Sequence, residues 1–238
     1  MCVLLVHHRV RADAPVVLLA NRDEAYDRAF AAPAPWPASP DGGAFVAPRD
    51  GKAGGTWVGA SPRGLVVALT NRGPTPPRDG VRSRGLLVVD VLRRADVADA
   101  RAFLDRHLKT TAYEPFHLLV LGRDDGLVVA GTREGTTCRT LPAGVHVVTN
   151  LHDLDTVPVP AAGAPRDGEP LDALVARLER LAADRDTPLP GDHRICKVGR
   201  TRGTVCSAVV TLPADGAPRM RFAPGPPHTT AFADVTSA

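Results

Sequence analysis

The chain opens with two apolar runs that are separated by a short polar connection. Residues 3–6 and 16–20 consist of Val, Leu and Ala, and neither run alternates between apolar and polar positions. The short connection predicts an antiparallel hairpin, and continuous apolar strands are typical of a sheet that is covered on both faces. Folding this hairpin about Asp13 places Cys2 opposite Glu24, to within two positions.

The next hundred residues alternate between strand patterns and segments rich in Pro and Gly. Residues 27–55 are of the second kind and predict a long loop with little regular structure. Residues 54–59 and 65–71 then predict a second hairpin. Its register returns Asn71 to the neighbourhood of Gly54 and Gly55.

Three later segments predict helices, and the rest of the chain predicts strands. The helices begin after Ser83, after Asp96 and at Pro170, residue types that favour helix starts. Strands are expected at 116–121, 127–131, 137–141, 145–149, 205–212 and near 220–222. No repeat or break in composition divides the sequence. The pattern therefore predicts one α+β domain over residues 1–238, with two stacked antiparallel sheets flanked by helices.

Composition narrows the class of protein. The 238 residues carry a net charge of +3, and only 4% are aromatic. Without a basic run that includes aromatic residues, this charge argues against a nucleic-acid partner and leaves acidic small molecules as candidate ligands. No apolar stretch reaches the roughly 18 residues of a transmembrane helix, and the start lacks a secretory signal pattern. The four cysteines lack metal-binding spacing, so we expect no metal and a reducing, cytoplasmic compartment.

The most informative chemical feature is the cysteine at position 2. Removal of Met1 before a small residue is chemically permissive, and it leaves an α-amine on the residue that carries the thiol. An ordinary α-amine pKa of about 7.7–8.0 suits a general base, so the two groups form a nucleophilic unit. Nearby Arg22 would lower the pKa of the thiol, and an amide such as Asn71 or Asn150 could stabilise an oxyanion. The competing interpretation is a buried structural cysteine.

The chain also resembles the NRDE family, which is also known as the transport and Golgi organisation protein 2-like family. The similar motifs are Met-Cys at 1–2, Asn-Arg-Asp-Glu at 21–24, Gly-Gly-Thr-Trp-Val-Gly at 54–59, Thr-Asn at 70–71, Ser-Arg-Gly at 83–85, Thr-Asn at 149–150 with Leu-Asp-Thr at 154–156, and Thr-Arg-Gly-Thr at 201–204. They occur in the family's order and extend the resemblance from Cys2 to about Phe222.

The resemblance implies the N-terminal nucleophile hydrolase fold, a four-layer αββα sandwich of two antiparallel sheets. By similarity to the cysteine amidohydrolases of that superfamily, the expected catalytic residues are Cys2 as nucleophile and base, Arg22 and Asp23 at the amine and substrate, Asn71 and Asn150 at the oxyanion, and Arg202 in support. The motifs add Asn21, Glu24, Trp57 and Arg84 as candidate substrate-binding residues. Glu24 is an alternative to Asp23 as the key acid, and Arg200 is an alternative to Arg202.

Two functions are consistent with these residues. The first is an amidohydrolase or acyltransferase that forms an acyl-Cys2 intermediate with a small amide or acyl-thioester and needs no cofactor. The second, implied by the resemblance, is a carrier of haem or acyl-coenzyme A in intracellular trafficking, with His7, His8 or Cys2 as candidate haem ligands. We rank the enzyme first. The sequence identifies neither the substrate nor the oligomeric state.

Overall fold

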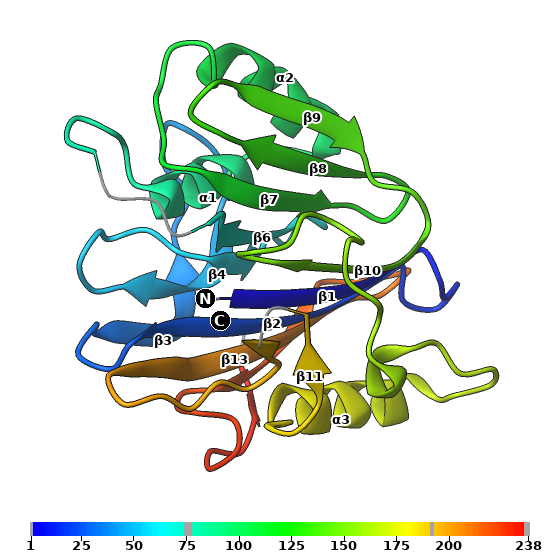
Figure 1. Ribbon diagram of the computed structural model, residues 1–238. Coiled ribbons are helices and arrows are strands. Elements are labelled where there is room, and N and C mark those ends of the chain that lie inside the picture. Colours follow the sequence, from blue (N-terminus) through cyan, green and yellow to red (C-terminus); the bar gives the residue numbers. More distant parts are fainter. Residues whose placement is uncertain (1, 74–77, 191–192, 236–238) are drawn as a thin grey trace.

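Two stacked antiparallel sheets form the centre of the computed structural model, which describes residues 2–73, 78–190 and 193–235 (Figure 1). The strand order is β10-β1-β2-β13-β14-β15 in the first sheet and β3 to β9 in sequence in the second. The first sheet contains β1 (Cys2–His8), β2 (Val16–Ala25), β10 (Gly144–Thr149), β13 (Arg202–Leu212), β14 (Arg219–Ala223) and β15 (Ala233–Asp234). The second contains β3 (Phe30–Trp36), β4 (Phe45–Asp50), β5 (Val58–Ala60), β6 (Val66–Asn71), β7 (Phe116–Leu121), β8 (Gly126–Gly131) and β9 (Thr136–Thr140).

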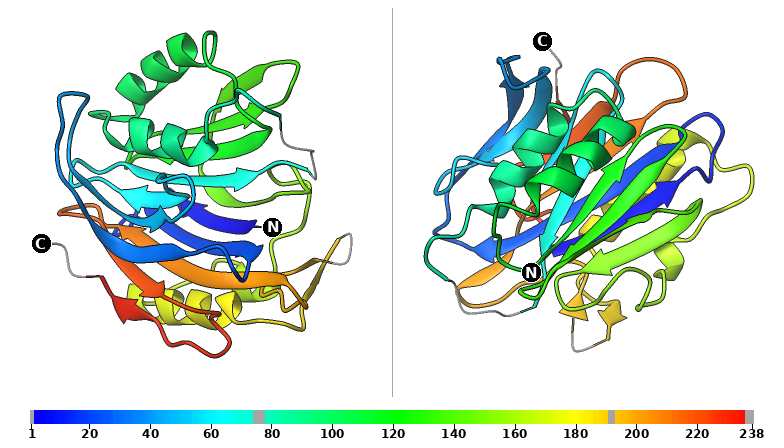
Figure 2. Two further views of the ribbon diagram at one scale, coloured as in Figure 1. Left: turned by 90° about the vertical axis from the view of Figure 1, so that its left-hand side faces the viewer. Right: turned by 90° about the horizontal axis from the view of Figure 1, so that it is seen from above.

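Helices cover the outer face of each sheet (Figure 2). The helices α1 (Arg84–Leu92) and α2 (Val97–His107) pack on the second sheet, and α3 (Leu171–Ala182) packs on the first. The remaining elements are the short helix η1 (Ala161–Gly163) and the small hairpin of β11 (Pro188–Leu189) and β12 (His193–Arg194). The predicted αββα sandwich is therefore confirmed. In the described part of the chain, no helix combines the length and apolarity needed to cross a membrane.

The opening hairpin shows why its strands are apolar at every position. Leu4 and Val6 point into the core between the two sheets, whereas Val3 and Leu5 point into the core beneath α3. Successive side chains of a strand alternate between faces, so a strand with helices on one side and a sheet on the other buries both sets. The continuous pattern thus specifies a central strand of a layered fold.

The register of this hairpin pairs Cys2 with Arg22, two positions from the predicted partner Glu24. The connection is closed by a hydrogen bond from the Arg9 amide to the Pro15 carbonyl, 2.6 Å long, and Arg9 adopts a positive φ of 54°. This turn centres the hairpin nearer to position 12 than to Asp13. The consequence is that a guanidinium, not a carboxylate, lies directly across from the thiol-bearing residue.

The prediction of a loop over residues 27–55 was wrong, because two strands, β3 and β4, lie within it. Pro is tolerated in β3 because that strand forms the edge of the second sheet, where one row of amides needs no partner. The pair is stabilised by Trp36, whose Nε1 donates to the Ala47 carbonyl at 3.0 Å and whose ring stacks on Phe45. Such cross-strand contacts are tertiary and leave no periodic signature in a Pro-rich sequence.

Candidate active site

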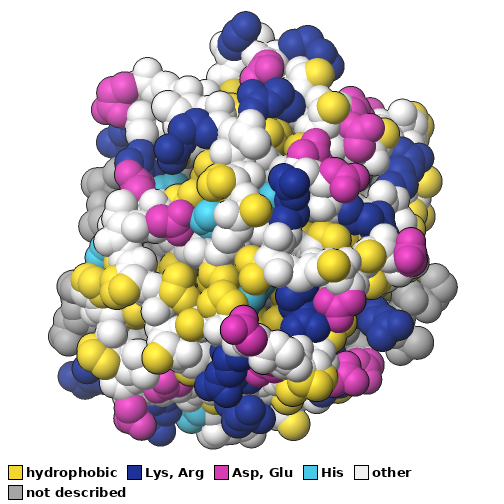
Figure 3. All heavy atoms as spheres, turned by 90° about the vertical axis from the view of Figure 1, so that its right-hand side faces the viewer, with side chains coloured by type: hydrophobic (Ala, Val, Ile, Leu, Met, Phe, Trp, Pro, Cys, Tyr) yellow, Lys and Arg dark blue, Asp and Glu magenta, His cyan; other side chains and the backbone are white. Residues whose placement is uncertain are grey.

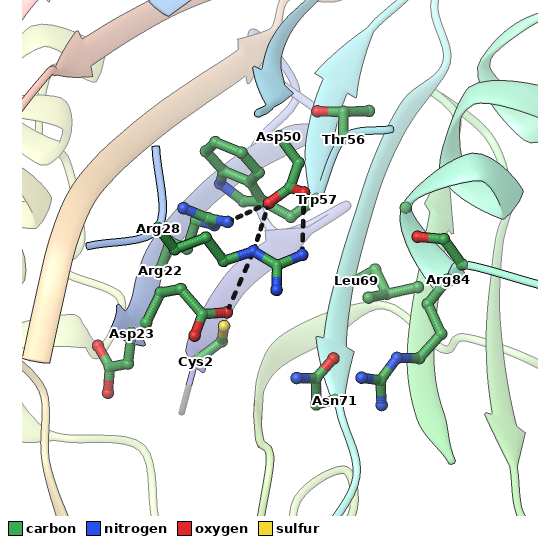
Figure 4. Close-up of a pocket in the computed structure, with 13 residues that line it drawn as sticks. Cys2, Arg22, Asp23, Arg28, Asp50, Thr56, Trp57, Leu69, Asn71 and Arg84 are labelled. Atoms are coloured by element: carbon green, nitrogen blue, oxygen red, sulfur yellow. Dashed lines mark hydrogen bonds and ion pairs between the residues drawn. The ribbon is translucent and has the colours of Figure 1, made fainter. Parts of the chain in front are cut away.

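A pocket at the start of β1 gathers seven of the ten predicted site residues (Figure 4). It opens between the two sheets at the end of the sandwich where β2 and β6 finish and α1 begins. Its cavity volume is about 110 Å³. The lining residues are Cys2, Arg22, Asp23, Glu24, Arg28, Asp50, Thr56, Trp57, Leu69, Asn71, Ser83, Arg84 and Gly85. Asn21, Asn150 and Arg202 are the predicted residues outside this lining.

Cys2 is the first described residue of β1 and reaches the pocket from the first sheet. Its backbone is fixed on both sides, by pairing with Arg22 and by a hydrogen bond from the Asn150 amide to the Cys2 carbonyl at 3.3 Å. Burial raises the pKa of the Cys2 thiol above its ordinary value, although the charge of Arg22 acts in the opposite direction. The thiol is therefore protonated at neutral pH, and nucleophilic attack requires a base.

Arg22 is buried in the pocket wall and is held rigidly. Its guanidinium lies over the Trp57 ring, with Cζ 4.1 Å from the ring centroid, and its Nη2 donates to Asp50 Oδ2 at 2.5 Å. Its other terminal nitrogen, Nη1, is buried and has no hydrogen-bond partner among the described residues. A buried donor without a partner is costly, so this nitrogen is an exception to the hydrogen bonding that fixes the rest of the side chain.

Asp50 and Arg28 are site residues that the sequence interpretation missed. Asp50 accepts hydrogen bonds from Arg28 Nε and Nη2 at 2.8 and 2.9 Å, in addition to the bond from Arg22. It also accepts bonds from the backbone amides of Lys52 and Ala53. Although burial opposes ionisation, the bonds from Arg28 hold the pKa of Asp50 below its ordinary value. An Asp followed by Gly in a Gly-rich segment predicts a turn in which the carboxylate accepts from backbone amides. The same pattern does not predict that two arginines bind this carboxylate.

Asp23 and Glu24 have different surroundings, which bears on the choice between them as the key acid. Asp23 is buried, and its Oδ1 accepts a hydrogen bond from Thr204 Oγ1 at 2.6 Å. Burial raises the pKa of Asp23 to about 6. Glu24 is more exposed and forms ion pairs with Arg28 and Arg202, at 3.8 and 3.3 Å. Asp23 is therefore the acid whose protonation can change near neutral pH.

Replacing Asp23 with asparagine is expected to stabilise the protein above about pH 6. Burial raises the pKa from an ordinary 3.8 to about 6, so the folded state binds this proton more tightly than the unfolded chain. The corresponding stability is present below about pH 4 and is lost as the pH rises through about 6. The advantage of Asp23→Asn at pH 7 approaches about 3 kcal/mol. Urea unfolding of both proteins between pH 4 and pH 8 measures it.

Asp153→Asn is the matched control for this experiment. Burial opposes the ionisation of Asp153, but hydrogen bonds from His117 and Arg72 outweigh it and hold the pKa of Asp153 below its ordinary value. Its stabilising contribution is thus present above the unfolded pKa and is lost as the pH falls. Between pH 4 and pH 8 the offset of Asp153→Asn from the wild type should therefore stay nearly constant, whereas the advantage of Asp23→Asn should grow as the pH rises. A constant free-energy difference between Asp23→Asn and the wild type across this range would contradict the assignment.

The opposite wall of the pocket is built from β6 and the first turn of α1. Asn71, the last residue of β6, has a side-chain amide with no hydrogen-bond partner among the described residues (Figure 4). Arg84 opens α1, and its Nη1 donates to the Pro115 carbonyl at 2.8 Å. Burial lowers the pKa of Arg84. Both side chains thus present unused donors to the cavity that Cys2 lines.

Two glycine motifs meet behind this wall. A Cβ on Gly55 would lie only 2.3 Å from the Gly85 carbonyl carbon, and one on Gly85 would lie about 3.0 Å from the Thr56 backbone. The Thr56 amide donates to the Gly85 carbonyl at 3.1 Å across this contact. The close approach, which other residues would prevent, brings the N-terminus of α1 to the pocket. This explains why residues 54–59 and 83–85 belong to one site.

Asn21 and Asn150 lie next to the pocket without lining it. The Asn21 side chain donates to the carbonyls of Ala182 and Ile195 at 2.9 and 2.8 Å. It therefore links the end of α3 and the segment at Ile195 to the first sheet. It faces away from Arg22 because neighbouring strand residues point to opposite faces. Asn150 contacts Cys2 through its backbone, and its buried Oδ1 has no hydrogen-bond partner within the described ranges.

Arg202 lies at the surface, and 58% of its side chain is exposed. Its contact with the site is indirect, through the ion pair with Glu24. Arg200, the alternative in the same segment, is also exposed and outside the pocket lining. The candidate haem ligands His7 and His8 lie at the far end of β1 from Cys2, where they are hydrogen-bonded to the carbonyls of Gly163 and Pro142. They therefore share no site with Cys2.

Solved structures with the same layers define the class of fold. A Caenorhabditis elegans ortholog of N-acylethanolamine-hydrolyzing acid amidase superposes with a TM-score of 0.51 at 15% identity, covering 87% of this chain and 92% of its own. A mutant of conjugated bile acid hydrolase from Clostridium perfringens gives a TM-score of 0.53 at 11% identity, covering 100% of this chain and 97% of its own. At these identities the likeness concerns the fold, which is that of the N-terminal nucleophile hydrolases.

The sequence assigns the chain to a family within this fold class. The model of the family described as transport and Golgi organisation 2 matches residues 1–164, and the chain belongs to that family. A homolog from Bos taurus is 39% identical over 77 residues, which are 32% of this chain and 28% of the homolog. A homolog from Mus musculus is 40% identical over 73 residues, or 31% and 26% of the two chains. The similarity to these relatives thus spans less than a third of their length.

Proposed function

We propose that the protein is an N-terminal cysteine amidohydrolase or acyltransferase that acts on a small amide or acyl-thioester through an acyl-Cys2 intermediate. The observation that carries the proposal is the position of Cys2, at the start of β1 and in a pocket whose opposite wall presents the Asn71 amide, which has no side-chain hydrogen bond among the described residues. Met1 lies outside the described residues, and its removal is part of the proposal. A reducing, cytoplasmic compartment belongs to it as well, because the nucleophile must remain a thiol.

The proposed reaction uses the α-amine that the loss of Met1 exposes. The amine accepts the thiol proton while Sγ attacks the carbonyl carbon and a C–S bond forms. The Asn71 amide donates to the resulting oxyanion. Collapse of the tetrahedral intermediate breaks the C–N bond, or the C–S bond of a thioester, and the proton passes to the leaving group. Water hydrolyses the acyl-Cys2 thioester, or an acceptor amine takes the acyl group.

Three further residues support this chemistry from the protein side. Asp23, buried beside Cys2, would orient the amine and stabilise its protonated form. The backbone amide of Asn150 donates to the Cys2 carbonyl and so holds the Cys2 backbone in place. Trp57 supports Arg22 from beneath, so that the guanidinium stays in one orientation. Because its groups need little reorganisation during the reaction, a site fixed in this way stabilises a developing charge better than a mobile one.

The cavity is small. Its size therefore favours a substrate that inserts only its reacting end over a large ligand that is enclosed completely. Its volume of about 110 Å³ is below the roughly 300–1,000 Å³ of pockets that enclose drug-sized ligands. The space matches an amide or thioester group with its immediate substituents. A haem carrier would need a larger cavity at Cys2, or one formed elsewhere by His7 and His8.

Intact-mass spectrometry tests the proposal directly. We expect the purified protein to lack Met1 and, after incubation with a panel of small amides and acyl-thioesters, to gain the mass of one acyl group on Cys2. Peptide mapping would locate the adduct, and its decay in water would mark a hydrolase. Retained Met1, or an unchanged mass with every compound, would contradict the mechanism. Reversible binding of acyl-coenzyme A without any adduct would favour the carrier function instead.

A further inference from the structure

We infer that Asp153, held by Arg72 and His117, is a positioning residue that sets the distance between Cys2 and Asn71 across the two sheets. We call Arg72, Asp153 and His117 the cross-sheet clamp. The inference deepens the proposed function, and its catalytic consequence rests on that function, in which Asn71 donates to the oxyanion. The structural part of the inference requires no turnover.

The nucleophile and the oxyanion donor come from different sheets. Cys2 begins β1 in the first sheet, and Asn71 ends β6 in the second. The two strands pack against each other between the sheets (Figure 1). Apolar packing of this kind is non-directional, whereas a misplacement of about 1 Å between reacting groups can cost about 100-fold in rate. Directional contacts at this end of the sandwich are therefore needed to fix the distance.

The segment after β10 joins the two sheets at this end through its backbone. The Asn150 amide donates to the Cys2 carbonyl at 3.3 Å, and the Asn150 carbonyl accepts from the Gly73 amide at 2.5 Å. Gly73 is two residues beyond Asn71. Two hydrogen bonds thus form a continuous path from the nucleophile, through Asn150, to the end of β6.

Asp153 attaches the same segment to the second sheet through its side chain. Arg72 donates to both carboxylate oxygens, from Nε at 2.9 Å and from Nη2 at 2.8 Å. The Nε2 atom of His117 donates to Oδ1 at 2.7 Å, because a carboxylate can only accept. Arg72 directly follows Asn71, and His117 pairs with Thr70 across β6 and β7. A bidentate arginine contact restrains both distance and orientation, so Asp153 is fixed relative to the end of β6.

His117 gives the clamp a rigid base. Its side chain is only 1% exposed, and burial lowers its pKa, so the imidazole is neutral near pH 7 and its one N–H is directed to Asp153. Within the segment, Thr149 Oγ1 accepts from the amides of Leu151 and His152 at 3.2 and 3.0 Å. This closed turn transmits the position of Asp153 to the neighbouring residue 150.

Ion pairs alone would not support this inference, because exposed pairs are common on this protein. The face at the β1–β2 turn, seen in Figure 3, carries positive and negative side chains interspersed. Arg11 pairs with Asp13 there, two residues along the same connection, so this pair joins no separate elements. Asp153 is instead 81 residues from Arg72 and 36 residues from His117. The clamp therefore connects three segments of the chain at the active-site end.

Asp153→Asn and Arg72→Met test the structural part by hydrogen exchange. NMR would follow the amides of Gly73 and Asn150, which donate the two hydrogen bonds between Cys2 and the end of β6 and are called the linking amides here. We expect both linking amides to exchange at least about tenfold faster in each variant than in the wild type, because the segment opens locally once its side-chain attachment is weakened. Two variants at different positions guard against a folding defect in one of them.

Asp155→Asn is the matched control. Asp155 lies in the same segment, its side chain is 46% exposed against 49% for Asp153, and it also binds a histidine, His146, at 2.7 Å. His146 belongs to β10, however, so this pair stays within the first sheet. Asparagine also tolerates the positive φ of 60° at this position. The linking amides should exchange within about twofold of the wild-type rate. Equal acceleration in Asp153→Asn and Asp155→Asn, or no acceleration in Asp153→Asn and Arg72→Met, would overturn the inference.

Two reagents that attack the same thiol test the catalytic consequence. S-phenyl thioacetate transfers its acetyl group to Cys2 Sγ through a tetrahedral oxyanion and releases thiophenol, whereas iodoacetamide alkylates Sγ by direct displacement of iodide without an oxyanion. We expect Asp153→Asn to slow acylation at least about tenfold and to leave alkylation within about twofold. Asp155→Asn should keep both rates. An unchanged acylation rate, or equal slowing of both reactions, would overturn the positioning role. A wild-type protein that forms no acyl-Cys2 would contradict the proposed function, and the exchange of the linking amides would still decide whether the clamp exists.

Discussion

Replacing Cys2 with alanine is expected to abolish acyl-adduct formation and to reduce turnover of any substrate by at least about 10⁴-fold, as removal of a nucleophile does in other hydrolases. The thiol is the group that forms the covalent bond, and alanine at position 2 still permits removal of Met1. Cys2 is only partly buried, so the fold should survive. Rates with the compound that acylates the wild type, together with intact mass, provide the measurement.

Cys138→Ala is the control that distinguishes the specific loss of the nucleophile from the loss of any one cysteine thiol. Cys138 is also a free, partly buried cysteine, but it lies on β9 at the edge of the second sheet and outside the Cys2 pocket. We expect this variant to react at the wild-type rate, within twofold. If Cys2→Ala kept the adduct, or if the two variants lost activity equally, Cys2 could not be the nucleophile.

Replacing Asp50 with asparagine is expected to lower the free energy of unfolding by about 3–5 kcal/mol, the range observed when one partner of a buried ion pair is removed. Asp50 is 6% exposed and is the anion that compensates both Arg22 and Arg28. Asparagine has nearly the same shape but no charge, so the buried Arg22 loses its counter-ion and the partly exposed Arg28 keeps only its ion pair with Glu24. Equilibrium unfolding in urea at pH 7 measures the change.

Asp13→Asn removes a carboxylate from an exposed arginine pair and serves as the comparison. The Asp13 side chain is 57% exposed in its pair with Arg11, and such surface pairs contribute about 0–1 kcal/mol. Asp50→Asn should also alter the alkylation rate of Cys2, because Arg22 loses the bond that orients it. Equal destabilisation by the two variants would show that Asp50 does not act as a buried counter-ion.

Local sequence was sufficient to predict the layered architecture and one side of the pocket. The unbroken apolar runs of β1 and β2 specify strands buried on both faces, and the short connection between them brings Cys2 to the polar residues 21–24. The helix starts at Asp96 and Pro170 were predicted from residue type, and Asp96 does cap its helix by accepting from the Asp99 amide. These features depend on neighbours within a few residues, which is why the sequence reveals them.

Tertiary structure decided the composition and the electrostatics of the pocket. Asp50 became its main counter-ion because β4, hidden in a Pro-rich segment, pairs in the second sheet and ends beside Arg22. Conversely, the alternation of strand faces directed Asn21 toward α3 and away from the site. Burial is the main cause of the raised pKa of Asp23, and Arg84 forms no ion pair among the described residues. The sequence alone thus determined where a thiol and its polar neighbours meet, whereas packing between the layers determined which charges are free to bind a ligand.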